Sequence, residues 1–87
     1  MRRYRRNPHC AARVVDGLAF VITPDDNKLH TLNEQATLLW QLAAHPLGAE
    51  AAAGALMMIY EVDAETALAD AAAWLEDFAS RDILVPE

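Results

Sequence analysis

The stretch KLHTLNEQATLLWQL, residues 28–42, passes from a strand-like pattern into a helix-like one with no loop between them. Lys28–Leu32 mix apolar and polar residues in the way that is typical of a short strand. Asn33 is a favourable N-cap, because its side-chain oxygen accepts a hydrogen bond from an unpaired N–H of the first helical turn. Apolar residues then recur at helical spacing, at Ala36, Leu39, Trp40 and Ala43. We therefore expect a strand joined directly to a helix that ends near Ala44.

Two further strands are expected before this stretch. The pair Asp16-Gly17 suits a type I′ hairpin turn after a strand over residues 12–16, because both turn positions must tolerate positive φ. Residues 18–23 then alternate, with the larger side chains on one face. These larger side chains are Leu18, Phe20 and Ile22, and we expect Phe20, like Trp40, to lie in the core. Residues 24–27, PDDN, favour a second turn, so Lys28–Leu32 is the third strand of a meander.

Two more helices are expected after the first. His45-Pro46-Leu47-Gly48 interrupts the chain, and an alanine-rich helix follows over about residues 49–61. Asp63 is the N-cap expected for a third helix, over about residues 64–81. The tail Ile83–Val85 is either a last strand or an apolar plug. Three strands followed by three helices predict an α+β fold.

The third helix has an unusually broad apolar face. On a helical wheel this face covers about 160°, against roughly 100° for a helix that only sits on a core. Its members are Ala64, Ala67, Leu68, Ala71, Ala72, Trp74, Leu75, Phe78 and Ala79. Such a face must meet more than one neighbouring surface. Trp74 lies at its edge, so a place in the core and a place in a groove wall both remain open.

Charge is distributed unevenly along these 87 residues, whose net charge is −6. All but two of the basic residues lie in the first thirteen positions, which contain no acid. We interpret residues 1–11 as a flexible basic arm and residues 12–87 as a single domain. A single cysteine excludes an internal disulfide, and no apolar run is long enough for a membrane helix. A cytoplasmic protein without a membrane partner is therefore expected.

The residues needed for catalysis are absent from the sequence pattern. His9 and Cys10 are adjacent, but neighbours on an extended segment point in opposite directions and cannot act as nucleophile and base. The histidines and Cys10 lack the spacing of metal ligands, and no glycine-rich phosphate loop is present. We therefore expect no enzyme activity and no cofactor.

Two segments together resemble the coenzyme PQQ synthesis protein D family, the PqqD-like peptide chaperones. They are VVDGLAFVITPDDNKLHTLNEQATLLWQL, residues 14–42, and YEVDAETALADAAAWLEDFASRDILV, residues 60–85. The shared features are the DG hairpin, the Pro/Asp turn, the strand ending in Leu-Asn-Glu, the Leu-Trp pair and the Tyr-x-Val-Asp motif. The resemblance implies a winged helix-turn-helix-like fold, with a three-stranded antiparallel sheet followed by three helices.

The same resemblance implies a function in peptide binding. Such domains, also known as RiPP recognition elements, bind the leader segment of a ribosomally made precursor peptide by strand addition. They present it to a modifying enzyme, which is a radical SAM protein in the PQQ pathway. Carried over by position, the strand partner would be Lys28, Leu29, His30, Thr31 and Leu32, and the helix wall would be Ala67, Asp70, Ala71, Trp74 and Phe78. Two positions depart from the family pattern, because Leu18 often bears an acid there and Asp82 replaces a frequent glycine.

A winged-helix protein that binds DNA is the alternative interpretation. The third helix would then read the duplex, but it carries Glu65, Asp70, Glu76 and Asp77 against only Arg81. Phosphate binding needs the opposite charge, so no nucleic-acid partner is expected. A homodimer that uses Met58 and the tail Ile83–Val85 remains open.

Overall fold

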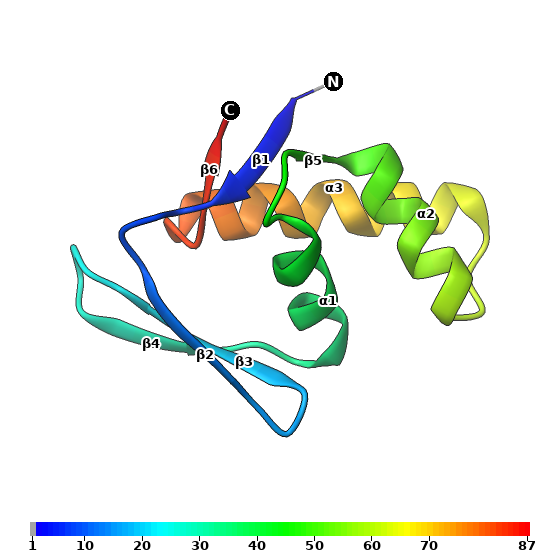
Figure 1. Ribbon diagram of the computed structural model, residues 1–87. Coiled ribbons are helices and arrows are strands. Elements are labelled where there is room, and N and C mark those ends of the chain that lie inside the picture. The colour runs from blue at the N-terminus through cyan, green and yellow to red at the C-terminus, as the bar shows by residue number, and fades with distance from the viewer. Residues whose placement is uncertain (1) are drawn as a thin grey trace.

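The structure, a computed structural model, describes residues 2–87. It contains three helices and two three-stranded antiparallel sheets, one ordered β2-β3-β4 and the other β5-β1-β6 (Figure 1). In chain order the elements are β1 Arg3–Arg6, β2 Ala11–Val15, β3 Leu18–Thr23, β4 Lys28–Thr31, α1 Glu34–Leu42, β5 Leu47–Gly48, α2 Ala49–Ile59, α3 Ala64–Ser80 and β6 Leu84–Pro86. The α+β class, the three-stranded meander and the three helices are as predicted; the second sheet was not predicted.

The turns of the meander have the conformations that the sequence indicates. Asp16 and Gly17 have φ values of 53° and 80°, as a type I′ turn requires. Asn27, at the end of the second turn, has a φ of 53°. These turns bring β3 into register between β2 and β4, with Phe20 opposite both Arg13 and Thr31.

The prediction that Phe20 of β3 lies in the core is wrong. Ala19, Val21 and Thr23 are buried, whereas Leu18 and Phe20 are only half-buried and Ile22 is exposed. A period of two shows that the faces of a strand differ, but it does not say which face meets the core. Here the face with the smaller side chains lies toward the rest of the protein, and the bulkier face points away.

Residues 3–6 form a strand, so the expectation of a flexible arm over residues 1–11 is wrong for the described part of that segment; residue 1 lies outside the described residues. The strand β1 is the central strand of its sheet and pairs with β5 and β6. Tyr4 is buried in the core. Arg6 donates from Nε to the carbonyl of Trp40 at 2.8 Å, and its guanidinium lies 3.9 Å from the centroid of the Trp40 ring. The basic residues of this segment gave no indication that Tyr4 is buried or that the backbone of β1 pairs with a strand on each side.

One hydrophobic core joins the two sheets and the helices. The predicted core residue Trp40 belongs to it, and so do Leu75 of α3 and Leu84 of β6. Asn33 and Asp63 cap α1 and α3 as predicted, with side-chain oxygens that accept from Ala36 N at 2.8 Å and Thr66 N at 2.7 Å. The strand interpretation of the C-terminal tail is correct, because β6 pairs with β1.

Candidate functional site

The strand β4 is an edge strand with one backbone face free. It pairs with β3 alone within the β2-β3-β4 sheet. Leu32 N donates to Ala19 O at 2.9 Å just beyond the strand, which sets the alternation of the antiparallel ladder. By that alternation His30 and Lys28 bond toward β3, while the N–H and C=O groups of Leu29 and Thr31 point away from the sheet. This edge therefore offers a donor and an acceptor at two positions to an added strand.

Thr37 holds the end of this edge strand against α1. Its hydroxyl accepts a hydrogen bond from Ala19 N at 2.9 Å and donates to Leu32 O at 3.3 Å. The hydroxyl thus bridges Ala19 N and Leu32 O, which would bond to each other directly in a regular ladder. Thr37 itself is buried. Together with the Asn33 cap, this contact makes the strand and the helix a single unit. The loop-free junction of residues 28–42 is the reason why the edge has a defined position.

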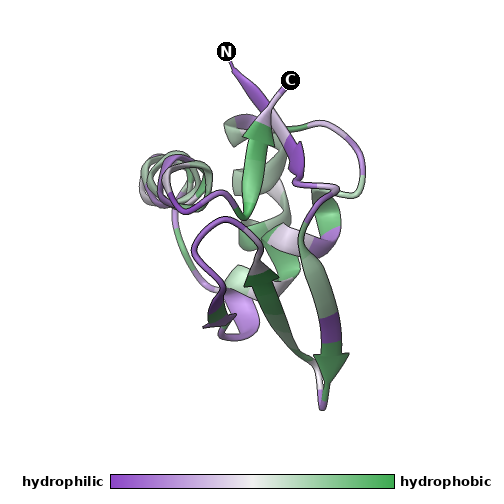
Figure 2. Ribbon diagram, turned by 90° about the vertical axis from the view of Figure 1, so that its left-hand side faces the viewer, coloured by the Kyte–Doolittle hydropathy of each residue, from purple (hydrophilic) through white to green (hydrophobic). Residues whose placement is uncertain are grey.

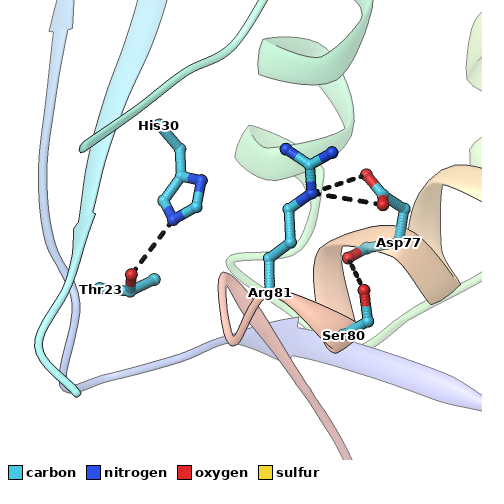
Figure 3. Close-up of polar contacts among 5 residues, drawn as sticks. All are labelled: Thr23, His30, Asp77, Ser80 and Arg81. Carbon is cyan, nitrogen blue, oxygen red and sulfur yellow. Dashed lines mark hydrogen bonds and ion pairs between the residues drawn. The ribbon is translucent and has the colours of Figure 1, made fainter. Parts of the chain in front are cut away.

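A hollow of about 430 Å³ lies between β4 and the C-terminal end of α3. Its lining residues are Asp26, Lys28, Leu29, His30, Ser80 and Arg81. Figure 3 shows His30 on the strand side of this space and Arg81 on the helix side. His30 Nε2 lies 3.1 Å from the hydroxyl of Thr23, and Arg81 Nε lies 3.2 Å from Asp77 Oδ2.

The turn beside this hollow is held by Asp26. Its carboxylate accepts a hydrogen bond from the Thr23 hydroxyl and another from Lys28 N at 3.2 Å. These bonds stabilise the ionised form, and the bond from Thr23 has the larger effect in lowering the pKa of Asp26. Asp26 is therefore a fixed negative charge at neutral pH, and it sets the position where β4 begins.

On the α3 side, the accessible aromatic side chain is Trp74. It is half-buried and stacks on Phe78, with ring centroids 6.5 Å apart and an interplanar angle of 25°. A small cleft of about 30 Å³ adjoins it, enough for a water molecule but not for a side chain. The cleft is lined by Gln35, Leu56, Tyr60, Val62, Ala67, Asp70 and Trp74.

The ten residues that the resemblance assigns to the site fall into two groups. Accessible residues are Lys28, Leu29, His30, Thr31, Asp70 and Trp74, of which His30 and Trp74 are half-buried. The buried residues are Leu32, Ala67, Ala71 and Phe78. Ala71 is fully buried and faces the core in this structure, so it does not form an open wall.

Several residues beside the edge strand were missed by the sequence analysis. Ser80 and Arg81 line the hollow, and Gln35 and Tyr60 line the cleft. A signal for Arg81 was present, because it follows Trp74 by seven residues and Asp77 by four and so shares their side of the helix. The sequence contains no such signal for Gln35 and Tyr60, because Gln35 lies in α1 and Tyr60 at the end of α2.

Among residues 2–87, no group of three or more histidine, cysteine or acidic side chains is placed to hold a metal ion. Within the same residues, none of the helices combines the length and apolar character needed to cross a bilayer.

Comparison with known proteins gives one family match and two structural matches. The family model described as coenzyme PQQ synthesis protein D (PqqD) matches residues 19–84, which include most of β3, all of β4 and all three helices. The chain belongs to the PqqD family. No curated protein matches it.

Two solved structures share the fold of this PqqD-family chain. One is described as TbiB1 in complex with the TbiA(beta) leader peptide, with a TM-score of 0.84 and 17% identity over 93% of this chain and 94% of that one. The other is a lasso peptide synthetase B1 complexed with the leader peptide, with a TM-score of 0.81 and 22% identity over 95% of this chain and 98% of that one.

Proposed function

We propose that this protein is a peptide-binding adaptor, without catalysis of its own, in the cytoplasm. It binds the leader segment of a ribosomally made precursor and presents it to a modifying enzyme such as a radical SAM protein. The observation that carries the proposal is the free edge of β4 beside a hollow at the end of α3. Membership of the PqqD family and the leader-bound state of both structural matches support it.

Strand addition accounts for affinity in this proposal. The outward N–H and C=O groups of Leu29 and Thr31 pair with the leader, and each hydrogen bond contributes about 0.5–1.5 kcal/mol net. A few such bonds do not offset the ordering of a flexible peptide, so apolar side-chain burial is also needed. Trp74, supported from below by Phe78, is the side chain placed to supply it.

Charge around the site favours a leader with basic residues. Asp70 lies beside Trp74, and Asp77 already neutralises Arg81 at 3.2 Å. The same acids disfavour the DNA-binding alternative, because phosphate binding needs cations along the helix that would read the duplex. A leader that carries Lys or Arg where it passes Asp70 therefore fits better than a nucleic acid.

The substitution Leu29→Pro tests the assignment of the edge. Proline removes the N–H of residue 29, which points away from β3, and proline is tolerated at an edge strand when its missing N–H faces solvent. We expect the affinity for the cognate leader, measured by calorimetry, to fall by roughly two- to tenfold for the lost hydrogen bond alone. Leu29→Ala is the matched control, since it shortens the same side chain but keeps the N–H.

Amide NMR signals of both variants show whether the meander stays folded. If Leu29→Pro keeps the fold and binds the leader as tightly as Leu29→Ala, the leader does not pair with β4. If the cognate leader leaves the amide signals of Lys28–Leu32 unshifted in the unsubstituted protein, the peptide-binding proposal itself fails.

A further inference from the structure

The face of the β2-β3-β4 sheet that points away from the core is mostly apolar. Cross-strand partners lie on the same face of an antiparallel pair, so the pairing places five apolar side chains together: Val15, Leu18, Phe20, Ile22 and Leu29. We call these five residues the outer sheet face. Three of them are well exposed, Val15 at 45%, Ile22 at 41% and Leu29 at 60%. Figure 2 shows β2 and β3 as largely hydrophobic.

This arrangement is the reverse of what stability alone favours. An antiparallel sheet with one solvated face normally turns its apolar side chains inward and its polar ones outward. Here the inward positions of β3 are Ala19, Val21 and Thr23, and the bulkier residues are outside. A contiguous apolar surface that the fold leaves uncovered is a candidate site of protein interaction.

The side of the sheet that bears the outer sheet face carries a single charge among the residues of β2, β3 and β4. Arg13 lies opposite Phe20 and is therefore on this side, and none of these three strands contains an acid. A complementary partner surface is apolar and holds a carboxylate where it meets Arg13.

We propose that the outer sheet face is the docking surface for the modifying enzyme that receives the bound leader. This inference rests on the proposed function, because Leu29 belongs both to the outer sheet face and to the edge that accepts the leader. A leader strand paired with β4 adds a fourth strand, and every second side chain of that strand lies on the same side of the sheet as the outer sheet face. The enzyme then contacts adaptor and leader on one continuous surface.

Area and charge disfavour a second copy of this chain as the occupant of this face. Three strands spaced about 4.8 Å apart, each about five residues long at about 3.4 Å per residue, present roughly 250 Å². A stable protein–protein interface needs about 800 Å² from each partner. Two copies would also bring together chains that each carry a net charge of −6. The face alone is too small for a lasting dimer, whereas a bound leader enlarges it for a transient complex.

The leader and the enzyme must then strengthen each other's binding. Because equilibrium coupling is reciprocal, an enzyme that contacts both adaptor and leader binds the loaded adaptor more tightly than the empty one, and by the same factor it tightens leader binding. A coupling of 1–3 kcal/mol is typical, which corresponds to roughly 5- to 150-fold.

The double substitution Val15→Thr with Ile22→Thr tests the proposal. Threonine keeps the β-branched shape of both residues and removes apolar surface, and neither residue lies on the β4 edge. We expect leader affinity without enzyme to stay within about twofold. For the cognate modifying enzyme, we expect the affinity for the leader-loaded adaptor to fall about tenfold, the effect of about 1.4 kcal/mol. Arg13→Glu, a surface charge reversal, should weaken enzyme binding in the same direction.

Met58→Ser is the matched control, because Met58 is 88% exposed but lies on α2, away from the sheet. It should leave both affinities unchanged. Unchanged enzyme binding by both the double variant and Arg13→Glu overturns the docking proposal and leaves the proposed function standing. Absence of leader binding by the unsubstituted protein overturns the proposed function instead. A dimer of the unsubstituted adaptor in sedimentation, lost in the double variant, would assign the face to a second copy and also overturn the proposal.

Discussion

At the scale of single residues, Asp82 at the end of α3 departs from the family pattern. We expect this departure to lower the free energy of unfolding. Asp82 has a φ of 61°, a conformation that L-residues adopt reluctantly. Its N–H donates to Ala79 O at 3.2 Å, and Ile83 N donates to Phe78 O at 3.0 Å. This pair of bonds is a Schellman motif, in which glycine is the favoured residue at the left-handed position. The geometry explains why a glycine frequently stands where this chain has Asp82.

Replacing Asp82 by glycine should therefore stabilise the protein. We expect Asp82→Gly to raise the free energy of unfolding by about 0.5–1 kcal/mol, after the greater backbone freedom of glycine in the unfolded chain is subtracted. Urea denaturation measures the change. Glu76→Gly is the matched control, because it removes the same charge from the middle of α3 and should lower stability by about 1 kcal/mol. Destabilisation by Asp82→Gly would contradict the argument from φ.

At the scale of elements, the junction between β4 and α1 depends on one buried hydroxyl. Thr37 connects the backbone of β3 to the residue that ends the edge strand, through Ala19 N and Leu32 O. A side chain of α1 thereby supplies hydrogen bonds at the end of the ladder between β3 and β4. These two hydrogen bonds fix the end of β4 relative to α1, and an edge strand that is fixed in this way needs little ordering when a peptide adds to it.

Thr37→Val should loosen this junction, because it keeps the shape of the side chain but leaves Ala19 N without an acceptor. We expect the free energy of unfolding to fall by about 1–3 kcal/mol, the cost of an unsatisfied buried donor. Hydrogen exchange of the Leu32 amide should accelerate at the same time. Thr37→Ser retains the hydroxyl and should keep the slow exchange of Leu32. If the Leu32 amide exchanges equally slowly in Thr37→Val and Thr37→Ser, the Thr37 hydroxyl does not hold the junction between β4 and α1.

At the scale of the whole molecule, the N-terminal strand connects parts of the chain that are distant in sequence. Tyr4 pairs with Leu47 on one side and with Pro86 on the other. Arg6 bonds to the carbonyls of Trp40 at 2.8 Å and Gln41 at 3.0 Å, where α1 ends and its carbonyls lack helical partners. A cation at a helix C-terminus is also favoured by the helix dipole.

Arg6→Ala should therefore lower global stability, although Arg6 lies in the most basic and least apolar part of the sequence. We expect a loss of about 1–2 kcal/mol from the helix-end hydrogen bonds and the contact with the Trp40 ring. Thermal or urea unfolding followed by Trp fluorescence reports it directly. Arg5→Ala, which changes an exposed neighbour on the same strand, should stay within about 0.5 kcal/mol. Equal effects of the two substitutions would show that Arg6 acts only as one more surface charge.

The sequence alone determined the features that depend on residues close together in the chain. The turn at Asp16-Gly17, the caps Asn33 and Asp63 and the strand Lys28–Thr31 all follow from local conformational preference and local hydrogen bonding. For the same reason, the sequence alone predicted where the edge strand of the candidate site lies.

Tertiary structure decided which surfaces are hidden. The resemblance assigned Ala71 and Phe78 to the helix wall, but packing buries both and leaves Trp74 and Arg81 near the open space. The alternation in β3 did not reveal that Phe20 points outward. Burial depends on pairings such as Tyr4 with Pro86, between the two ends of the chain. No local pattern encodes such a contact, because its energy exists only once the distant partner is in place.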